Sequence, residues 1–203
     1  IAINTFKEIV RNKFLYLILV FAFAFIIFSI LLGKLTIGDD SKVIVDFGLA
    51  MIEIFSLLWV LFVGSQLLFK EIEWKTIFLI LSKPIKRYEF IVGKFLGFSA
   101  TIFLIILVQS LLFLSVLALK DIEITKMIAY SLRFTFLKME TLLALVFFFS
   151  TFMSNMLTVV VSLMVYFLSH NFANLIDMAL RSKNIVFEYF AKVLNLVFPP
   201  FES

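Results

Sequence analysis

A run of 25 residues, Phe95 to Leu119, contains no acidic or basic side chain. A helix needs about 20 apolar residues to cross the hydrocarbon core of a bilayer, so this run is long enough to span one. Phe14 to Leu32 is also free of charge, and Phe47 to Phe69 is interrupted only by Glu53. Because one soluble core cannot bury three such runs, the sequence predicts a chain that crosses a membrane several times.

The last third of the chain predicts two further spans. Residues 141–176 carry no Asp, Glu, Lys or Arg, and 36 residues are too many for one span. We place the break at Ser154-Asn155, a small polar pair that can turn and cap a helix. The fourth span then begins near Ile128 and the fifth ends between His170 and Ile176. The predicted fold class is an all-α polytopic membrane protein with five transmembrane helices, forming a single domain over residues 1–203.

Composition excludes several classes of protein. Hydrophobic residues make up 63% of the chain and charged residues 16%, whereas soluble domains have about 25% charged residues. There are no Cys and one His, which excludes disulfides, cysteine nucleophiles and multi-histidine metal sites. Gly93-Lys94 lacks the earlier glycine of a phosphate loop, because Tyr88 stands there. We therefore expect no catalytic residues, no metal site and no enzyme activity in this chain itself.

Charge near the span ends predicts the orientation. Residues 1–13 and 70–94 hold nine Lys and Arg in 38 positions, whereas residues 33–46, 120–140 and 177–203 hold nine in 62. The richer side is expected to face the cytoplasm. The N-terminus is therefore predicted to be cytoplasmic, in a multi-pass protein of a prokaryotic cytoplasmic membrane. The net charge of +4 fits an anionic lipid leaflet better than nucleic acid, since no basic run is interleaved with aromatic residues.

The first 14 residues have an amphipathic pattern. Ile3, Phe6, Val10 and Phe14 recur at helical spacing, with polar residues between them. The pattern predicts an elbow helix in the membrane interface, and Thr5-x-x-Glu8 fits a capping box. The alternative is a simple cytoplasmic extension of the first span. The polar and charged residues assigned to this elbow helix are Thr5, Lys7, Glu8, Arg11 and Lys13.

Polar residues inside the predicted spans are few. Glu53 lies about two turns inside the outer end of the second span, and Gln109 lies in the middle of the third. We expect Glu53 to reach the outer interface or to pair with Arg133 or Lys138. The alternative is that Glu53 and Gln109 line a substrate path. Span centres with so little charge argue against an ion-coupled secondary transporter.

Residues 70–97 read KEIEWKTIFLILSKPIKRYEFIVGKFLG. The apolar run Ile77 to Leu81 is too short to span, and Ser82-Lys83-Pro84 interrupts the helix, which restarts near Arg87. The segment therefore predicts a short helix at the cytoplasmic face between spans two and three. Gly93-x-x-x-Gly97 allows close helix approach, which we expect to occur within the chain rather than between copies.

These residues, together with TFKEIVRNKFLY at the start and FFFSTFMSN between spans four and five, resemble the permease subunits of ABC-2 type transporters. The similar branch includes sodium-export and nitrous-oxide-reductase maturation permeases. The resemblance implies six spans per chain, so the chain is expected to be truncated before the sixth. It also implies two permease copies side by side, as a homodimer or with a related chain, in the lipid bilayer. Lys86 departs from the family pattern, which has a capping Ser there.

The resemblance further implies two separate ATPase subunits that bind ATP and Mg, and export driven by ATP. The residues expected to contact the ATPase form the coupling helix and its flanks: Glu71, Glu73, Lys75, Thr76, Ile77, Leu81, Ser82, Lys83, Pro84 and Arg87. The predicted function is therefore the permease subunit of an ATP-driven transporter. The alternative is a non-transport membrane scaffold or assembly factor without an ATPase partner.

Overall fold

The computed structural model describes residues 1–35, 40–66, 69 and 87–171, and all the elements in them are helices. The chain divides into two compact units, residues 1–159 and 160–203. The helices are, in order, α1 (Ala2–Val10), α2 (Lys13–Leu35), α3 (Asp40–Trp59), the π-helix η1 (Val60–Gly64), α6 (Arg87–Leu119), α7 (Lys126–Ser150) and α8 (Asn155–His170). The prediction of an all-helical chain is therefore confirmed for these residues.

Three of the described helical segments are long and apolar enough to cross a membrane: Leu15–Gly33, Asp40–Gly64 and Tyr88–Leu119. They correspond to the first three predicted spans, and they support the membrane class. Helix α7 has a sufficient length, but it carries Arg133, Lys138 and Glu140 in its middle. Helix α8 has 16 residues, fewer than a span usually needs. The turn predicted at Ser154-Asn155 is present, since α7 ends at Ser150 and α8 begins at Asn155.

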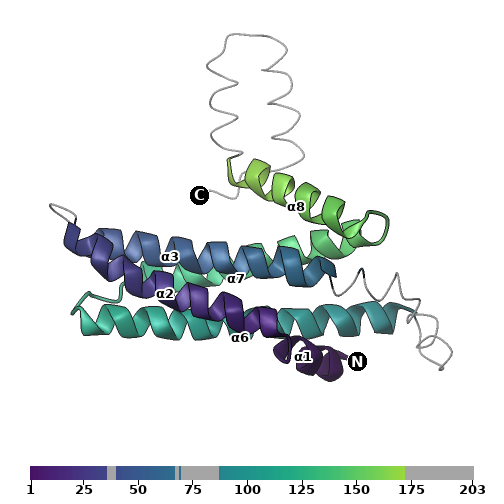
Figure 1. The fold of residues 1–203 in the computed structure, drawn as a ribbon, viewed down its shortest axis with the longest axis horizontal. Helices are drawn as coiled ribbons and strands as arrows, with labels where there is room; N and C mark the ends of the chain where they lie inside the picture. The colour runs from purple at the N-terminus through teal and green to yellow at the C-terminus, as the bar shows by residue number, and fades with distance from the viewer. Residues whose placement is uncertain (36–39, 67–68, 70–86, 172–203) are drawn as a thin grey trace, which may run out of the picture. The chain divides into compact units, whose positions relative to one another are not determined.

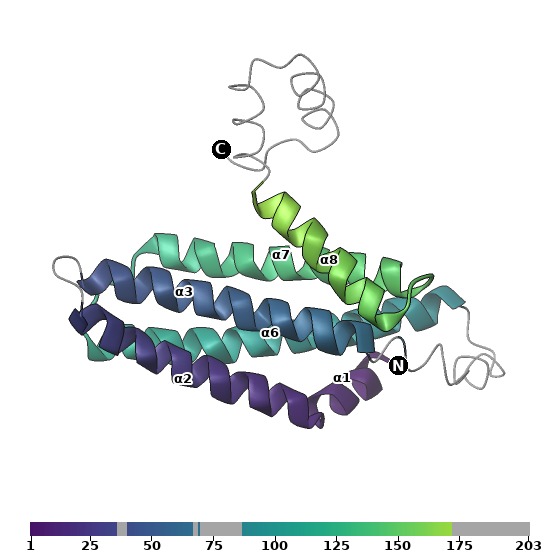
Figure 2. The same cartoon turned by 45° about the horizontal axis from the view of Figure 1, so that its top comes forward.

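Helix α3 is the central helix of the first unit. It contacts α2, α6 and α7, and the long helices run antiparallel to their sequence neighbours (Figures 1 and 2). Of the residues in its most apolar window, 56% are buried, compared with 28% for α2. Side chains on α3 are therefore enclosed by the bundle, whereas α2 exposes most of its apolar surface, as a lipid-facing helix does.

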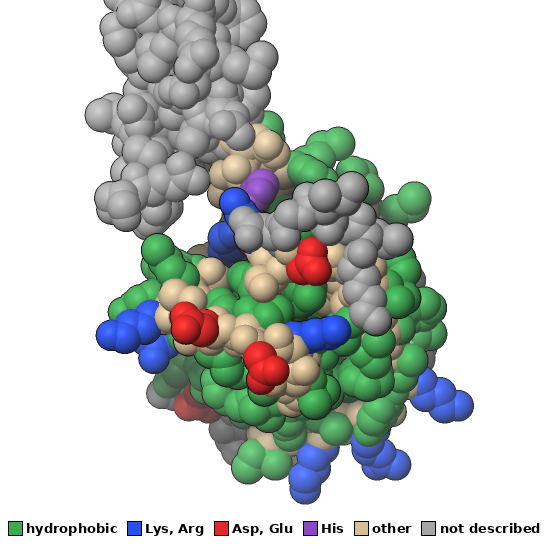
Figure 3. Space-filling model, turned by 90° about the vertical axis from the view of Figure 1, so that its left-hand side faces the viewer, with side chains coloured by type: hydrophobic (Ala, Val, Ile, Leu, Met, Phe, Trp, Pro, Cys, Tyr) green, Lys and Arg blue, Asp and Glu red, His purple; other side chains and the backbone are tan. Residues whose placement is uncertain are grey.

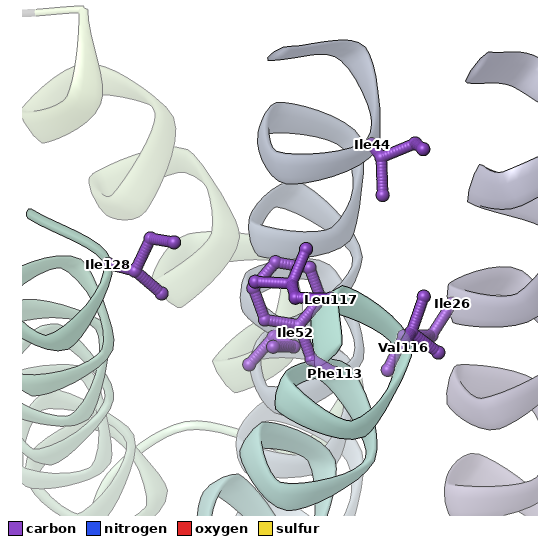
Figure 4. Packing of buried hydrophobic residues seen from close by; sticks show 7 residues of the cluster. All are labelled: Ile26, Ile44, Ile52, Phe113, Val116, Leu117 and Ile128. Carbon is purple, nitrogen blue, oxygen red and sulfur yellow. The ribbon is translucent and has the colours of Figure 1, made fainter. Parts of the chain in front are cut away.

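A hydrophobic cluster joins the helices at the end where α6 turns into α7. It contains Ile26 of α2, three residues of α6 and residues of α3 and α7, drawn in Figure 4: Ile26, Ile44, Ile52, Phe113, Val116, Leu117 and Ile128. Gly48 makes room for the largest of them. A Cβ at position 48 would lie only 2.7 Å from Cδ2 of Phe113, so the ring occupies the space that a side chain would need. The close contact of α3 with α6 therefore depends on this glycine.

Helix α1 packs against the beginning of α6. A Cβ at Gly97 would lie 2.8 Å from Cβ of Thr5 and 2.9 Å from the carbonyl oxygen of Ala2. A Cβ at Gly93 would lie 2.9 Å from Cγ2 of Ile1. The expectation that Gly93-x-x-x-Gly97 packs within the chain is thus confirmed, and its partner is the amphipathic N-terminal helix.

The predicted capping box at Thr5-x-x-Glu8 is wrong. The helix begins at Ala2, so Thr5 lies inside it, donates its N–H to the carbonyl of Ile1 at 2.9 Å, and is buried against α6. The buried face of α1 is formed by Thr5 and Ile9, because the small residues of α6 meet it there. Ile3, which belongs to the predicted apolar stripe, is 72% exposed and free to face lipid.

Figure 3 views the bundle from the end where α2 leads to α3 and α6 to α7. Acidic and basic side chains are interspersed on this end among hydrophobic ones. The charged residues with exposed side chains near these helix ends are Asp40, Lys42, Lys120, Asp121, Glu123 and Lys126. Mixed charges of this kind suit a surface that meets water and lipid headgroups rather than hydrocarbon.

Candidate functional site: a polar cluster inside the bundle

An ion pair connects the central helix to α7. Nζ of Lys138 lies 3.1 Å from Oε1 of Glu53. The Glu53 side chain is 22% exposed and the Lys138 side chain 47%, so the carboxylate is the more enclosed partner. Of the partners considered for Glu53, the structure selects Lys138, while Arg133 lies elsewhere on α7, along a groove that faces α6.

The ion pair lies near the middle of its helices, because α3 begins before the apolar run that defines the predicted span. Helix α3 begins at Asp40, seven residues before the apolar run, because Asp40, Lys42 and Asp46 continue the same helix. Glu53 is thus 13 residues from the start of the continuous helical segment 40–64 and 11 from its end. At 1.5 Å per residue this is about 20 Å from the start of the helix, although Glu53 still lies six residues, nearly two turns, after the apolar run begins at Phe47. A carboxylate at this depth requires a partner, and Lys138 supplies it.

A second polar contact lies one turn along α3. The hydroxyl of Ser56 donates to Oε1 of Gln109 at 3.2 Å, and both residues are buried. Ser56 follows Glu53 by three positions, so the two side chains share a face of α3. Glu53, Ser56, Gln109 and Lys138 therefore form one polar cluster, contributed by α3, α6 and α7.

One donor of this cluster is not satisfied. Nε2 of Gln109 is buried and has no hydrogen-bond partner among the residues that the structure describes. Leaving a buried donor without an acceptor costs about 1–3 kcal/mol, so the site favours any group that offers an oxygen to Nε2. The cluster thus combines a paired carboxylate and ammonium group with a buried amide whose nitrogen lacks an acceptor in the described part of the chain.

Aromatic residues follow the cluster along α3. Trp59 lies three positions after Ser56, is 0% exposed, and has an indole N–H without a partner in the described part of the chain. Its ring centroid is 6.2 Å from that of Phe98, which in turn lies 5.3 Å from Phe147. The π-helix η1 begins directly after Trp59. Single π-turns of this kind are frequent at functional sites, because they loosen the regular helix ladder.

The cluster offers no metal site among the described residues, since no three His, Asp or Glu side chains come together there. Glu140, on the same helix as Lys138, instead faces α6, where Ser99 hydrogen-bonds to it. The acidic groups of the bundle are therefore kept apart. Polar recognition is the chemistry that this arrangement supports.

Sequence reasoning named Glu53, Gln109 and Lys138 but did not find Ser56 or Trp59. Ser56 has a detectable signal, since it stands one turn from Glu53 in a segment with few other polar residues. Trp59 has no such signal, because a tryptophan in an apolar run is ordinarily a packing residue. The convergence of three helices on these residues depends on packing at Gly48 and elsewhere, which no local pattern specifies.

The other predicted site residues divide into two groups. In the elbow helix, Thr5 is buried, while Lys7, Glu8, Arg11 and Lys13 are exposed. The residues assigned to ATPase contact, from Glu71 to Pro84, lie outside the described residues. Arg87 is the first residue of α6, as the predicted restart of the helix requires.

Three comparisons with known proteins, against family models, curated proteins and solved structures, returned no match.

Proposed function

We propose that this chain is the membrane-spanning permease subunit of an ATP-driven ABC-2 type transporter, and that it couples to a separate ATPase subunit. The observation that carries the proposal is the polar cluster of Glu53, Ser56, Gln109 and Lys138, in which α3 and α6 are apolar enough to cross a membrane and α7 contributes Lys138. Polar and charged groups at such a depth are costly and are retained mainly where they serve a function. A path for a polar or amphiphilic substrate is the function that fits them.

The packing of α1 and α6 supports a route for coupling. Helix α6 begins at Arg87, directly after the segment expected to contact the ATPase, and α1 packs on it at Gly93 and Gly97. The same helix carries Gln109 of the polar cluster. A displacement at the start of α6 would therefore reach the cluster through one continuous helix. In this proposal α1 is the interfacial elbow helix, α7 and α8 complete five spans, and a sixth span and a second permease copy complete the transporter.

A second candidate function is ion-coupled secondary transport. The centres of the spans were expected to be nearly free of charge, but Glu53 and Lys138 form an ion pair midway along α3. A carboxylate near mid-membrane is what ion-coupled transporters use. Transport that requires an ion gradient and not ATP would favour this candidate over the ABC-2 proposal.

The proposal is tested at the predicted coupling helix. We expect Ile77→Asp or Leu81→Asp to abolish co-purification of an ATPase subunit from membranes, because each places a charge in the apolar centre of the contact. Lys83→Ala should have a smaller effect that weakens further at high salt, since exposed charges are screened. Ile124→Asp is the matched control, because Ile124 is an exposed isoleucine in the turn between α6 and α7.

Membrane expression of each variant is measured in parallel, so that loss of the permease itself is recognised. Undiminished recovery of the ATPase with both Ile77→Asp and Leu81→Asp would remove the coupling assignment. The absence of any co-purifying ATPase from the unaltered protein would favour the scaffold or assembly factor instead.

A further inference from the structure

An apolar groove of about 430 Å³ runs between α6 and α7. A volume of this size lies within the range of small-molecule sites, roughly 300–1,000 Å³. Four residues of α6 and four of α7 line it: Phe103, Ile106, Leu107, Ser110, Leu132, Arg133, Phe136 and Leu137. All are apolar except Ser110 and Arg133. Arg133 is the one charged residue of the lining, and it contributes its aliphatic stem there, so its guanidinium lies outside the apolar wall.

The Arg133 guanidinium has no acidic partner among the described residues. Lys138, five positions later on the same helix, is neutralised by Glu53. Glu140 is directed to Ser99 of α6 and does not form an ion pair with Arg133. Asp121 and Glu123 precede α7 in the turn, and neither pairs with Arg133. The guanidinium beside this apolar wall is therefore solvated by an anion or by water.

The depth of Arg133 suits a lipid headgroup. It lies seven residues after Lys126, the first residue of α7, or about 10 Å along the helix. Lys126, Tyr130 and Arg133 follow one another at i, i+4 and i+7, so they share one face that leads from the groove to the helix end. Tyr130 is 53% exposed, and tyrosine is typical of the membrane–water interface. From the groove to the helix end, this face changes from apolar to basic. A phospholipid changes in the same order, from acyl chain to phosphate.

We propose that the groove between α6 and α7 binds an anionic phospholipid of the surrounding bilayer, with an acyl chain along the apolar wall and the phosphate on Arg133. Arginine binds phosphate through two parallel N–H donors, which gives a stronger contact than a point charge does. The apolar lining accounts for the acyl chain, and the guanidinium, which has no acidic partner in the described part of the chain, accounts for the anionic head. The site is separate from the cluster at Glu53, and its occupation does not require ATP or transport.

Binding is measured on the full chain purified in detergent, by native mass spectrometry during titration with phosphatidylglycerol or with phosphatidylcholine of the same acyl chains. We expect phosphatidylglycerol to be retained preferentially. Arg133→Gln should weaken its binding about tenfold, the loss expected for one charge-assisted contact. Arg133→Lys should keep part of the affinity, because it retains the charge but not the paired donors. Lys42→Gln removes the same charge from the start of α3, away from the groove, and should leave binding unchanged.

A second pair of variants tests the groove without altering charge. Ser110→Phe fills the groove and should reduce lipid retention, whereas Ser115→Phe, on an exposed face of α6 outside the groove, should not. Thermal unfolding of each variant checks that the protein remains folded. Equal retention of phosphatidylcholine, equal binding of a fatty acid such as oleate, or unchanged binding in both Arg133→Gln and Ser110→Phe would overturn the proposal.

Discussion

Lys138 on α7 and Glu53 on α3 are joined by a 3.1 Å ion pair midway along the helices that carry them. The contact ties α7, which carries three charged residues in its middle, to α3, the most enclosed of the three candidate membrane-spanning segments. It also keeps two charges from standing alone where the surrounding side chains are apolar. The pair therefore has a structural role, whatever its further role in transport.

The first prediction concerns the strength of this pair. Glu53→Gln leaves the Lys138 ammonium without its partner, and Lys138→Met leaves the Glu53 carboxylate without its partner. A double-mutant cycle should give a coupling energy of about 0.6 kcal/mol, the average for polar contacts between membrane helices, and at most about 1.7 kcal/mol. The measurement is the free energy of unfolding during titration with sodium dodecyl sulfate. Reversing both charges, Glu53→Lys with Lys138→Glu, should restore most of the stability.

The same variants test whether the ion pair serves only helix packing or also transport. If the pair only holds α3 to α7, the charge-reversed protein should also recover the ATPase stimulation of the assembled transporter. Recovery of stability without recovery of activity would mean that the sign of the charge at each position is used by the substrate. A coupling energy near zero would contradict the assignment of a structural role.

The second prediction concerns Ser56 and Gln109. Ser56→Ala removes the hydroxyl that donates to Gln109 Oε1, so it leaves a buried carbonyl oxygen unsatisfied and should cost about 1–3 kcal/mol. Adding Gln109→Leu removes the amide as well, including the Nε2 that has no partner in the described residues. The double variant should therefore be as stable as the native protein or more so.

Transport activity should not follow stability in these variants. The double variant keeps the fold but lacks both polar groups, so it should lose transport if the cluster lies on the substrate path. Full activity in this stable double variant would exclude Gln109 and Ser56 from that path. Ser115→Ala, which removes an exposed serine hydroxyl from the same helix as Gln109, is the control.

The third prediction concerns the docking of α1. Gly97→Ala places a methyl group 2.8 Å from Cβ of Thr5 and 2.9 Å from a backbone oxygen, neither of which can rotate away. Overpacking of this kind costs about 1–3 kcal/mol. Gly64→Ala provides the matched control, since its methyl would lie 3.5 Å from Leu143 and Val146, an ordinary contact distance. That variant should be neutral or stabilised by about 0.5–1 kcal/mol, because alanine loses less backbone freedom than glycine.

Unfolding of both glycine variants is measured side by side, and protease sensitivity of residues 1–12 reports whether α1 is released. Equal stability of Gly97→Ala and Gly64→Ala would contradict the close packing of α1 on α6.

The helices were predictable where a run of apolar residues specifies them. Phe14 to Leu32 and Phe95 to Leu119 lie within α2 and α6, and the break at Ser154-Asn155 separates α7 from α8. The start of α3 was not predictable, because hydropathy marks the edge of an apolar run and not the end of a helix. Residues 40–46 include Asp40, Lys42 and Asp46 and are still helical, and these seven residues place Glu53 near the middle of the helix rather than near its end.

The candidate site was predictable only in part, for a related reason. Glu53 and Gln109 can be identified in the sequence because charged and amide side chains are rare in its apolar runs. Their partners follow from which helices touch, and that depends on small residues such as Gly48, whose missing side chain admits Phe113. The partner of the Gly93-x-x-x-Gly97 motif is equally non-local, since α1 lies about 90 positions earlier in the chain.

The last prediction concerns topology, which the absence of cysteine makes accessible to labelling. Single cysteines at Asp40 and Glu123 lie at the end of the bundle where α3 begins and where α6 turns into α7, and both positions are exposed. We expect a membrane-impermeant thiol reagent to label both in intact cells. Ser154→Cys is exposed between α7 and α8, and it should be labelled only after permeabilisation.

Ser29→Cys is the control for accessibility, because Ser29 is 0% exposed in α2 and should resist the reagent in both conditions. The physical basis is the distribution of Lys and Arg, whose excess in residues 1–13 and 70–94 is expected to keep those segments in the cytoplasm. If α2, α3 and α6 all cross, the turns at Asp40 and Glu123 must then lie on the outer side together. Labelling of Ser154→Cys but not of Asp40→Cys in intact cells would invert the orientation. Labelling of Asp40→Cys and Glu123→Cys under different conditions would mean that α3 and α6 do not both cross the membrane.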